Sequence, residues 1–250
     1  MPRFFATIAY NGRNYVGWQI QPNGLGVQQV VQDALSVILR GSVAVTGAGR
    51  TDAGVHARGM VAHFDWEGDT LSSVDLVHKL NNFLPKEISV SDIRPVKSDA
   101  HARFSALSRT YSYHITTQKD PFLYGLTCRI HFHPDLQRMN ALCEVLKEYN
   151  DFTSFSKLHT DVKTNLCRIE SAAWEQQGDH RYTFTITADR FLRNMVRAIV
   201  GTMLEAGRGR IDERGLRRII EAKNRSVAGD SAPGHALFLE NVAYPDDIWL

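Results

Sequence analysis

Apolar positions along the first hundred residues follow two different spacings. Residues 27–40 repeat apolar side chains at intervals of three and four, which predicts an amphipathic helix that ends at Gly41. A second helix is predicted over residues 71–84, before Pro85. Strand patterns, in which apolar and polar residues alternate, lie at residues 4–10, 42–46, 59–66 and 88–96. The resulting order, β-α-β-β-α-β, is a split β-α-β arrangement.

The second half of the chain repeats this order with further helices. Helical spacing occurs at residues 134–149, 191–206 and 212–223, and strand patterns at residues 110–117, 167–175, 182–187 and 236–243. No strong letter-by-letter repeat links the halves, so the duplication rests on element order. We therefore predict an α+β fold of two ferredoxin-like halves, residues 1–104 and 105–250, with a mainly antiparallel sheet and a central cleft.

A glycine-rich stretch between two predicted strands of the first half carries one carboxylate. Residues 47–57 read GAGRTDAGVHA, with Asp52 near the centre. Glycine permits positive φ and close approach of another group, so this loop is suited to hold Asp52 in a fixed position. A plain hairpin connection is one alternative. A phosphate-binding loop is another, but no helix pattern follows and the G-K-[ST] sequence of such loops is missing.

The composition is that of an ordinary globular protein with a sizeable core. The chain has 250 residues, of which 43% are hydrophobic, and a net charge of +2. Its three cysteines lack C-x-x-C spacing, so neither a disulfide framework nor a zinc site is predicted, and His131 and His133 are expected at the surface. The amino end has neither the length nor the flanks of a signal peptide or a membrane-spanning helix, which favours a cytoplasmic protein.

The glycine-rich loop is similar to the signature of the tRNA pseudouridine synthase A family. Further pieces of that family's pattern occur in order along nearly the whole chain: AYNGRNYVGWQ (residues 9–19), FLP (83–85), HARFSA (101–106), RTYSY (109–113), FLRNMVR (191–197) and APGHALFL (232–239). Two positions depart from the pattern, since Asn11 stands where the family commonly has Asp and Ala236 where it commonly has Gly.

The resemblance implies an activity and a set of site residues. Conversion of uridine to pseudouridine breaks the C1′–N1 bond and rejoins the uracil through C5, and because this isomerisation is redox neutral, no cofactor and no metal are expected. Asp52 corresponds to the family's catalytic residue, which either attacks C1′ or takes the C2′ proton. The resemblance implies that Arg197 pairs with Asp52, and that Arg50 either binds phosphate or fills the space that an extruded base leaves. It also implies that Tyr111 stacks on the uracil and that Leu237 lines its pocket. Further substrate contacts are expected from Arg58, Arg103 and Arg193.

Two of these roles have a physical counterpart in the local pattern. The helix around Arg197 is apolar at Met195 and Ile199, so Arg197 is expected near a buried edge, where a guanidinium needs a partner. Tyr111 lies on a predicted strand with Tyr113 on the same face. Packing across the sheet is therefore the alternative to stacking on a flipped base.

Basic residues cluster in two parts of the chain, at positions 94–119 and 181–225. One account is a solvated helix face with internal ion pairs. The other is contact with phosphate, because the planar guanidinium group of arginine can donate two hydrogen bonds to phosphate oxygens. By resemblance the partner is tRNA and the protein is a homodimer. The basic residues between Arg208 and Arg225 are then candidates for binding the tRNA at a distance from the catalytic residue.

Two classes of function follow from these observations. The first, implied by the resemblance, is a tRNA pseudouridine synthase that acts on uridines 38, 39 and 40 of the anticodon stem-loop. The second is a non-catalytic RNA-binding protein with the same duplicated fold. Asp52 and its expected arginine partner favour the enzyme, because a buried carboxylate that faces phosphates would only weaken binding.

Overall fold

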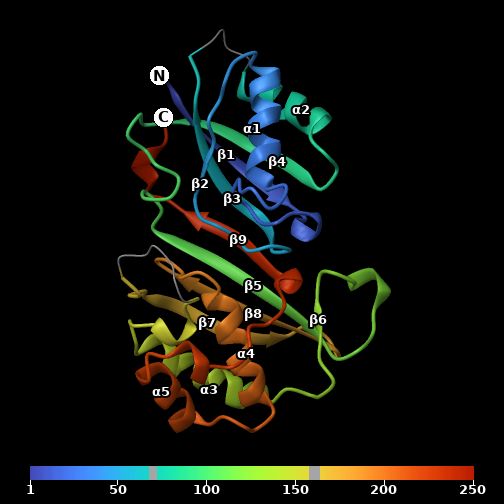
Figure 1. Cartoon of the computed structure of the whole chain (residues 1–250), viewed down its shortest axis with the longest axis vertical. Helices are drawn as coiled ribbons and strands as arrows, with labels where there is room; N and C mark the ends of the chain where they lie inside the picture. Colours follow the sequence, from blue (N-terminus) through green and yellow to red (C-terminus); the bar gives the residue numbers. More distant parts are fainter. Residues whose placement is uncertain (68–71, 158–163) are drawn as a thin grey trace. The chain divides into compact units, whose positions relative to one another are not determined.

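The chain divides into two compact units in a computed structural model that describes residues 1–67, 72–157 and 164–250 (Figure 1). Unit 1 comprises Met1–Leu107 together with Leu239–Leu250, and unit 2 comprises Ser108–Phe238. The boundary proposed from the sequence, between residues 104 and 105, lies close to the end of the first segment. The return of the C-terminal residues to unit 1 was not foreseen.

Unit 1 is built on a sheet in the order β4-β1-β3-β9, in which β1 is antiparallel to both β3 and β4 and β2 is antiparallel to β3. Its strands are β1 (Arg3–Tyr10), β2 (Thr46–Gly47), β3 (His56–Asp65), β4 (Ile88–Val96) and β9 (Leu237–Ala243), whose first two residues belong to unit 2. Buried side chains of β1 and β3, such as Ile8, Met60 and Phe64, form the centre of this core. β1 and β3 thus each lie between two partners, and β3 is buried along most of its length.

Two helices complete unit 1. Helix α1 (Val27–Ile38) buries an apolar stripe, and α2 (Ser73–Phe83) contacts both α1 and β4. The Ser72 side chain caps α2 by accepting a hydrogen bond from the backbone N–H of Asp75. The helix predicted over residues 71–84 is therefore confirmed from Ser73 onward, while Leu71 lies outside the described residues.

Unit 2 repeats part of this arrangement. Its sheet has the order β5-β8-β7, with β6 in parallel pairing to β5, and helix α3 packs against β7, α4 and α5 (Figure 1). The elements are β5 (Ser108–Thr116), β6 (Cys128–Arg129), α3 (Leu136–Lys147), β7 (Ile169–Gln176), β8 (Arg181–Ala188), α4 (Met195–Gly207) and α5 (Glu213–Glu221). The duplication of the two halves stays a prediction, since unit 2 has a strand, β6, in parallel pairing to β5, whereas the pairings of β1 with β3 and β4 are antiparallel.

These observations confirm the predicted α+β class and the mainly antiparallel sheet. The central cleft stays a prediction. No helix within the described ranges is long and apolar enough to cross a membrane.

Two predicted elements differ in extent, each for a local physical reason. The strand predicted over residues 42–46 is reduced to β2, because the N–H groups of Val43 and Val45 bond instead to the side chains of Ser36 and Gln32 on α1. The helix predicted from residue 191 begins only at Met195. Asn194, directly before it, has a left-handed conformation with φ of 67°, which cannot continue a right-handed helix.

Candidate active site

Asp52 lies on the loop between β2 and β3, as the sequence predicts. Burial alternates along this part of the loop: Arg50 is exposed, Thr51 is buried and Asp52 is half-buried. An extended segment gives this alternation, because successive side chains point to opposite sides. Arg50 and Asp52 therefore share the side that faces away from the core.

Thr51 anchors the loop from within unit 1. Its hydroxyl oxygen lies 2.8 Å from the hydroxyl oxygen of Tyr10, at the end of β1, and both side chains are buried. Its carbonyl accepts a hydrogen bond from the backbone N–H of Trp18 at 3.3 Å. On the other side of Asp52, the N–H of Val55 donates to the Asp52 carbonyl at 3.2 Å.

The segment before α1 packs directly on this loop through two glycines. A Cβ atom on Gly12 would lie 2.0 Å from the carbonyl oxygen of Val55, and one on Gly17 would lie 2.3 Å from that of Thr51. No larger residue fits at either position without displacing the backbone. The sequence presented this segment only as part of a resemblance. The feature of the sequence that relates to this support is the pair of glycines, Gly12 and Gly17, that allow the close packing.

His56 also contacts the segment before α1. Its ring is buried, and its Nδ1 atom accepts a hydrogen bond from the backbone N–H of Gly12 at 3.0 Å. A ring nitrogen that accepts carries no proton, so this hydrogen bond requires the neutral imidazole. The segment before α1 therefore contacts the loop at Thr51 and again at Val55 and His56.

Two of the arginines expected to bind substrate also lie in unit 1, and both are exposed. Arg58 pairs with Glu240 of β9, with 3.0 Å between nitrogen and oxygen. The guanidinium carbon of Arg103 lies 5.5 Å from the ring centroid of Phe104, whose side chain is 76% exposed. Neither arginine is buried, so both remain accessible to a polyanion.

Arg197 lies in the first turns of α4, in unit 2, and is half-buried. Its Nε donates to the carbonyl of Ala232 at 2.7 Å, and the N–H of Ala232 donates back to the Arg197 carbonyl at 2.9 Å. A Cβ atom on Gly201, one turn later, would lie only 1.7 Å from the carbonyl oxygen of Asp230. The segment around Ala232 is thus held tightly against α4.

The turn before α4 is fixed by a side-chain network. The amide of Asn194 donates to the Ser231 hydroxyl at 2.6 Å, and Arg225 donates to the same hydroxyl at 2.8 Å. Asn194 is one of the residue types that tolerate positive φ. Its neighbour Arg193 is exposed.

Tyr111 and Tyr113 sit on β5 with different surroundings. The half-buried Tyr111 ring meets Phe191 edge to face, with 5.2 Å between centroids. Tyr113 is fully buried and donates to the carbonyl of Pro233 at 3.0 Å, and burial raises the pKa of its hydroxyl. Leu237, which follows the same segment, is 5% exposed at the start of β9.

The expected site residues divide between the units. Asp52, Arg50, Arg58 and Arg103 belong to unit 1, and Tyr111, Arg193, Arg197 and Leu237 belong to unit 2. The pairing of Asp52 with Arg197 stays a prediction, since these residues belong to different units.

The described residues also bear on metal binding. Across residues 1–67, 72–157 and 164–250, no group of three or more His, Cys, Asp or Glu side chains is placed to hold a metal ion. His131 and His133 are both exposed, as expected.

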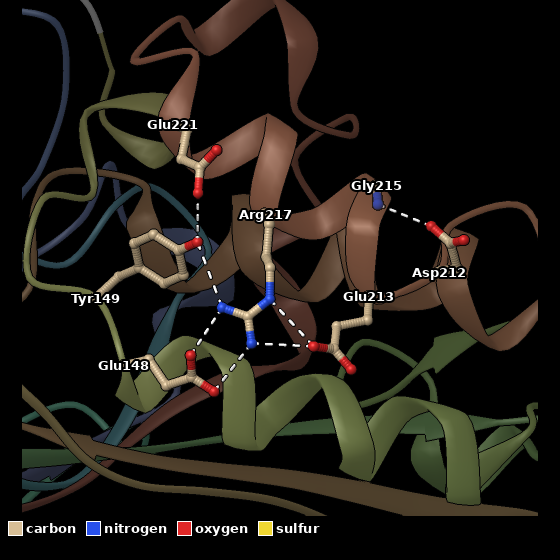
Figure 2. A network of polar contacts seen from close by, with 7 residues as sticks. All are labelled: Glu148, Tyr149, Asp212, Glu213, Gly215, Arg217 and Glu221. Carbon is tan, nitrogen blue, oxygen red and sulfur yellow. Dashed lines mark hydrogen bonds and ion pairs between the residues drawn. The ribbon is translucent and has the colours of Figure 1, made fainter.

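Several arginines of the second basic cluster are already paired. Arg217 on α5 binds both carboxylate oxygens of Glu148, at 2.7 and 3.0 Å, and also Glu213 (Figure 2). Arg208 and Arg210 both pair with Glu205. These contacts favour the ion-pair account for these three arginines.

Comparison with known proteins places the chain in a family. The model of a family described as "tRNA pseudouridine synthase" matches residues 6–105 and 149–245. Relatives named "tRNA pseudouridine synthase A" include one from Parabacteroides distasonis, 58% identical over 249 residues that cover 100% of this chain and 98% of the relative. Another, from Exiguobacterium sibiricum, is 37% identical over 246 residues that cover 98% of each chain. The chain therefore belongs to the tRNA pseudouridine synthase family.

Proposed function

We propose that this protein isomerises uridine to pseudouridine in tRNA, at positions 38, 39 and 40 of the anticodon stem-loop. Its family and the name shared by its relatives support the activity. The structural observation that carries the proposal is the fixed setting of Asp52, between a buried Thr51 and a closed turn to Val55. A reaction at a single sugar carbon needs a carboxylate held in this way.

Asp52 acts on the sugar in either of two balanced schemes. In the first, the carboxylate attacks C1′ and uracil leaves as an anion through N1; C5 then attacks C1′ and releases the carboxylate. In the second, Asp52 takes the C2′ proton while uracil leaves, and returns it when C5 joins C1′. Both schemes end with loss of the C5 proton and protonation of N1, so no electrons are exchanged with a cofactor.

The remaining site residues act around this centre. Arg197 is the proposed ionic partner of Asp52, because its planar guanidinium matches the geometry of a carboxylate. Tyr111 stacks on the uracil and Leu237 lines its pocket. Arg50 contacts phosphate or fills the space of the extruded base, and Arg58, Arg103 and Arg193 bind the tRNA backbone.

The cellular setting follows from the substrate. We propose that the protein works in the cytoplasm as a homodimer and without a metal or an organic cofactor. The redox-neutral reaction supports the last point, and the size of a tRNA relative to one subunit supports the dimer.

The function is tested by incubating the pure protein with tRNA transcripts, followed by carbodiimide treatment and sequencing. Pseudouridine is expected at positions 38–40. Asp52→Asn should abolish its formation and leave tRNA affinity within a few-fold, because the amide keeps the shape and loses the charge. Asp33→Asn, at an exposed position of α1, is the matched control and should be fully active. A tenth of wild-type turnover in Asp52→Asn would contradict the assignment of Asp52.

A further inference from the structure

We propose that the Tyr10 hydroxyl is a positioning group for Asp52 and that it acts through the side chain of Thr51. The proposal rests on the proposed function, since it gives Tyr10 a part in the reaction of Asp52. Tyr10 ends β1 and Thr51 directly precedes Asp52. The two hydroxyl oxygens form a buried contact of 2.8 Å between residues 41 positions apart in the chain.

This contact restricts the backbone at Asp52. Thr51 is held at its side chain by Tyr10 and at its carbonyl by Trp18, while the Asp52 carbonyl is held by Val55. With both peptide groups around Asp52 fixed, the position of its carboxylate depends mainly on its own side-chain torsions. A displacement of about 1 Å at a reacting group can cost a factor of roughly 100 in rate.

Tyr10 is itself part of a rigid support. Its ring lies 6.0 Å from that of Trp18, and Trp18 packs so closely on the loop that a Cβ atom on Gly47 would lie 2.3 Å from its Nε1. β1 pairs with β3 on one side and β4 on the other. The Tyr10 hydroxyl therefore connects the loop to the centre of the sheet. The conformation of the loop at Thr51 is then restrained by the sheet as well as by contacts within the loop.

The pair of hydroxyls is also chemically suited to this place. Each hydroxyl can donate or accept, and neither carries a charge at neutral pH. The contact therefore holds the backbone next to Asp52 without placing a further charged side chain there.

Tyr10→Phe tests the proposal, because it removes one oxygen atom and keeps the ring beside Trp18. We expect kcat for pseudouridine formation to fall roughly 10- to 100-fold while KM and tRNA affinity stay within about twofold. Thr51→Val should reproduce this loss, and Thr51→Ser, which keeps the hydroxyl, should remain close to wild type. The double variant Tyr10→Phe/Thr51→Val should lose no more than either single variant, since all three lack the same contact.

Tyr244→Phe is the matched control within unit 1. The Tyr244 hydroxyl donates to the carbonyl of Ala102 at 2.6 Å, so the variant loses a comparable hydrogen bond. It should lower the thermal unfolding midpoint about as much as Tyr10→Phe, with kcat unchanged. A Tyr10→Phe enzyme with a kcat equal to that of Tyr244→Phe, or losses that multiply in the double variant, would overturn the positioning role. A wild-type protein that forms no pseudouridine would instead overturn the proposed function.

Discussion

The partial exposure of Tyr111 defines a test of its role. Its ring meets Phe191 edge to face and is only half-buried. Stacking of a base on an aromatic ring is worth about 1 to 3 kcal/mol. Tyr111→Phe should therefore retain most of the activity, and Tyr111→Leu should lose far more, when initial rates of pseudouridine formation are compared. Equal losses in the two variants would show that Tyr111 packs and does not stack.

His63 on β3 makes the stability of unit 1 depend on pH. Burial, with the positive charges that His101 and Arg3 can carry, lowers the pKa of His63 to about 4, and only Asp65 acts in the opposite direction. Its Nδ1 accepts a hydrogen bond from the N–H of Ala102 at 3.2 Å, which requires the neutral ring.

The sign of the pH effect follows from the lowered pKa. Between the unfolded value of about 6.5 and the folded value of about 4, the unfolded chain binds the proton and the folded chain does not, so stability falls as the pH falls. The full effect is at most about 3.4 kcal/mol, from a difference of about 2.5 between the two pKa values at about 1.36 kcal/mol for each. Denaturant unfolding of His63→Asn, whose side-chain oxygen can replace Nδ1, should show a weaker dependence over this range. The exposed His131→Asn should follow wild type, and a His63→Asn curve as steep as that of wild type would contradict the prediction.

What the sequence could predict at this scale depends on distance along the chain. The setting of Asp52 was predictable because glycines, arginine and carboxylate all lie within residues 47–57. The contact of Thr51 with Tyr10 was not, since no periodicity encodes which side chains meet across a sheet. The same is true of His63, whose partners Arg3 and His101 come from distant parts of the sequence.

Arg217 links two helices, so its removal should act on stability rather than on substrate binding. It joins Glu213 on α5 to Glu148 at the end of α3, and lies over the ring of Tyr149 (Figure 2). Arg217 also lowers the pKa of the Glu148 carboxyl below its usual range. Arg217→Ala should lower the midpoint of thermal unfolding, because α5 loses this attachment.

Arg218→Ala is the control for this prediction, as Arg218 is the next residue on the same helix and is exposed. Its unfolding midpoint should match that of wild type. An Arg217→Ala protein as stable as Arg218→Ala would show that the network contributes nothing measurable, as holds for many surface ion pairs.

At the scale of elements, the pattern located helices and long strands but not the partners of their backbone groups. The β2 region shows why. Val43 and Val45 are buried on either side of the exposed Ala44, which gives a strand pattern, yet their N–H groups bond to side chains of α1. Hydrophobic spacing reports which side chains are buried and says nothing about what satisfies the backbone.

For the whole molecule, the exposed arginines Arg214 and Arg218 are the remaining test of a shared tRNA surface. Charge reversal at both should weaken tRNA binding and flatten its salt dependence, because fewer counterions are released. An isolated anticodon stem-loop should be affected much less. Mixing this variant with Asp52→Asn should restore some activity if one tRNA contacts both subunits of a dimer. The shared surface would be contradicted if the protein were a monomer at the concentration used in the assay. It would also be contradicted if the mixture of the two variants regained no activity.

The return of the chain to unit 1 through β9 has a consequence for synthesis on the ribosome. Residues 239–250 lie against β3 and β4, where Glu240 approaches Gly59 and Trp249 bridges to Val96. They are translated only after all of unit 2, so in a nascent chain that has emerged as far as Phe238 the edge of β3 opposite β1 is paired only at its end, by β2. Such an edge is prone to pair with other chains. Unit 1, which carries the Asp52 loop, therefore has all of its residues only after unit 2 has been synthesised.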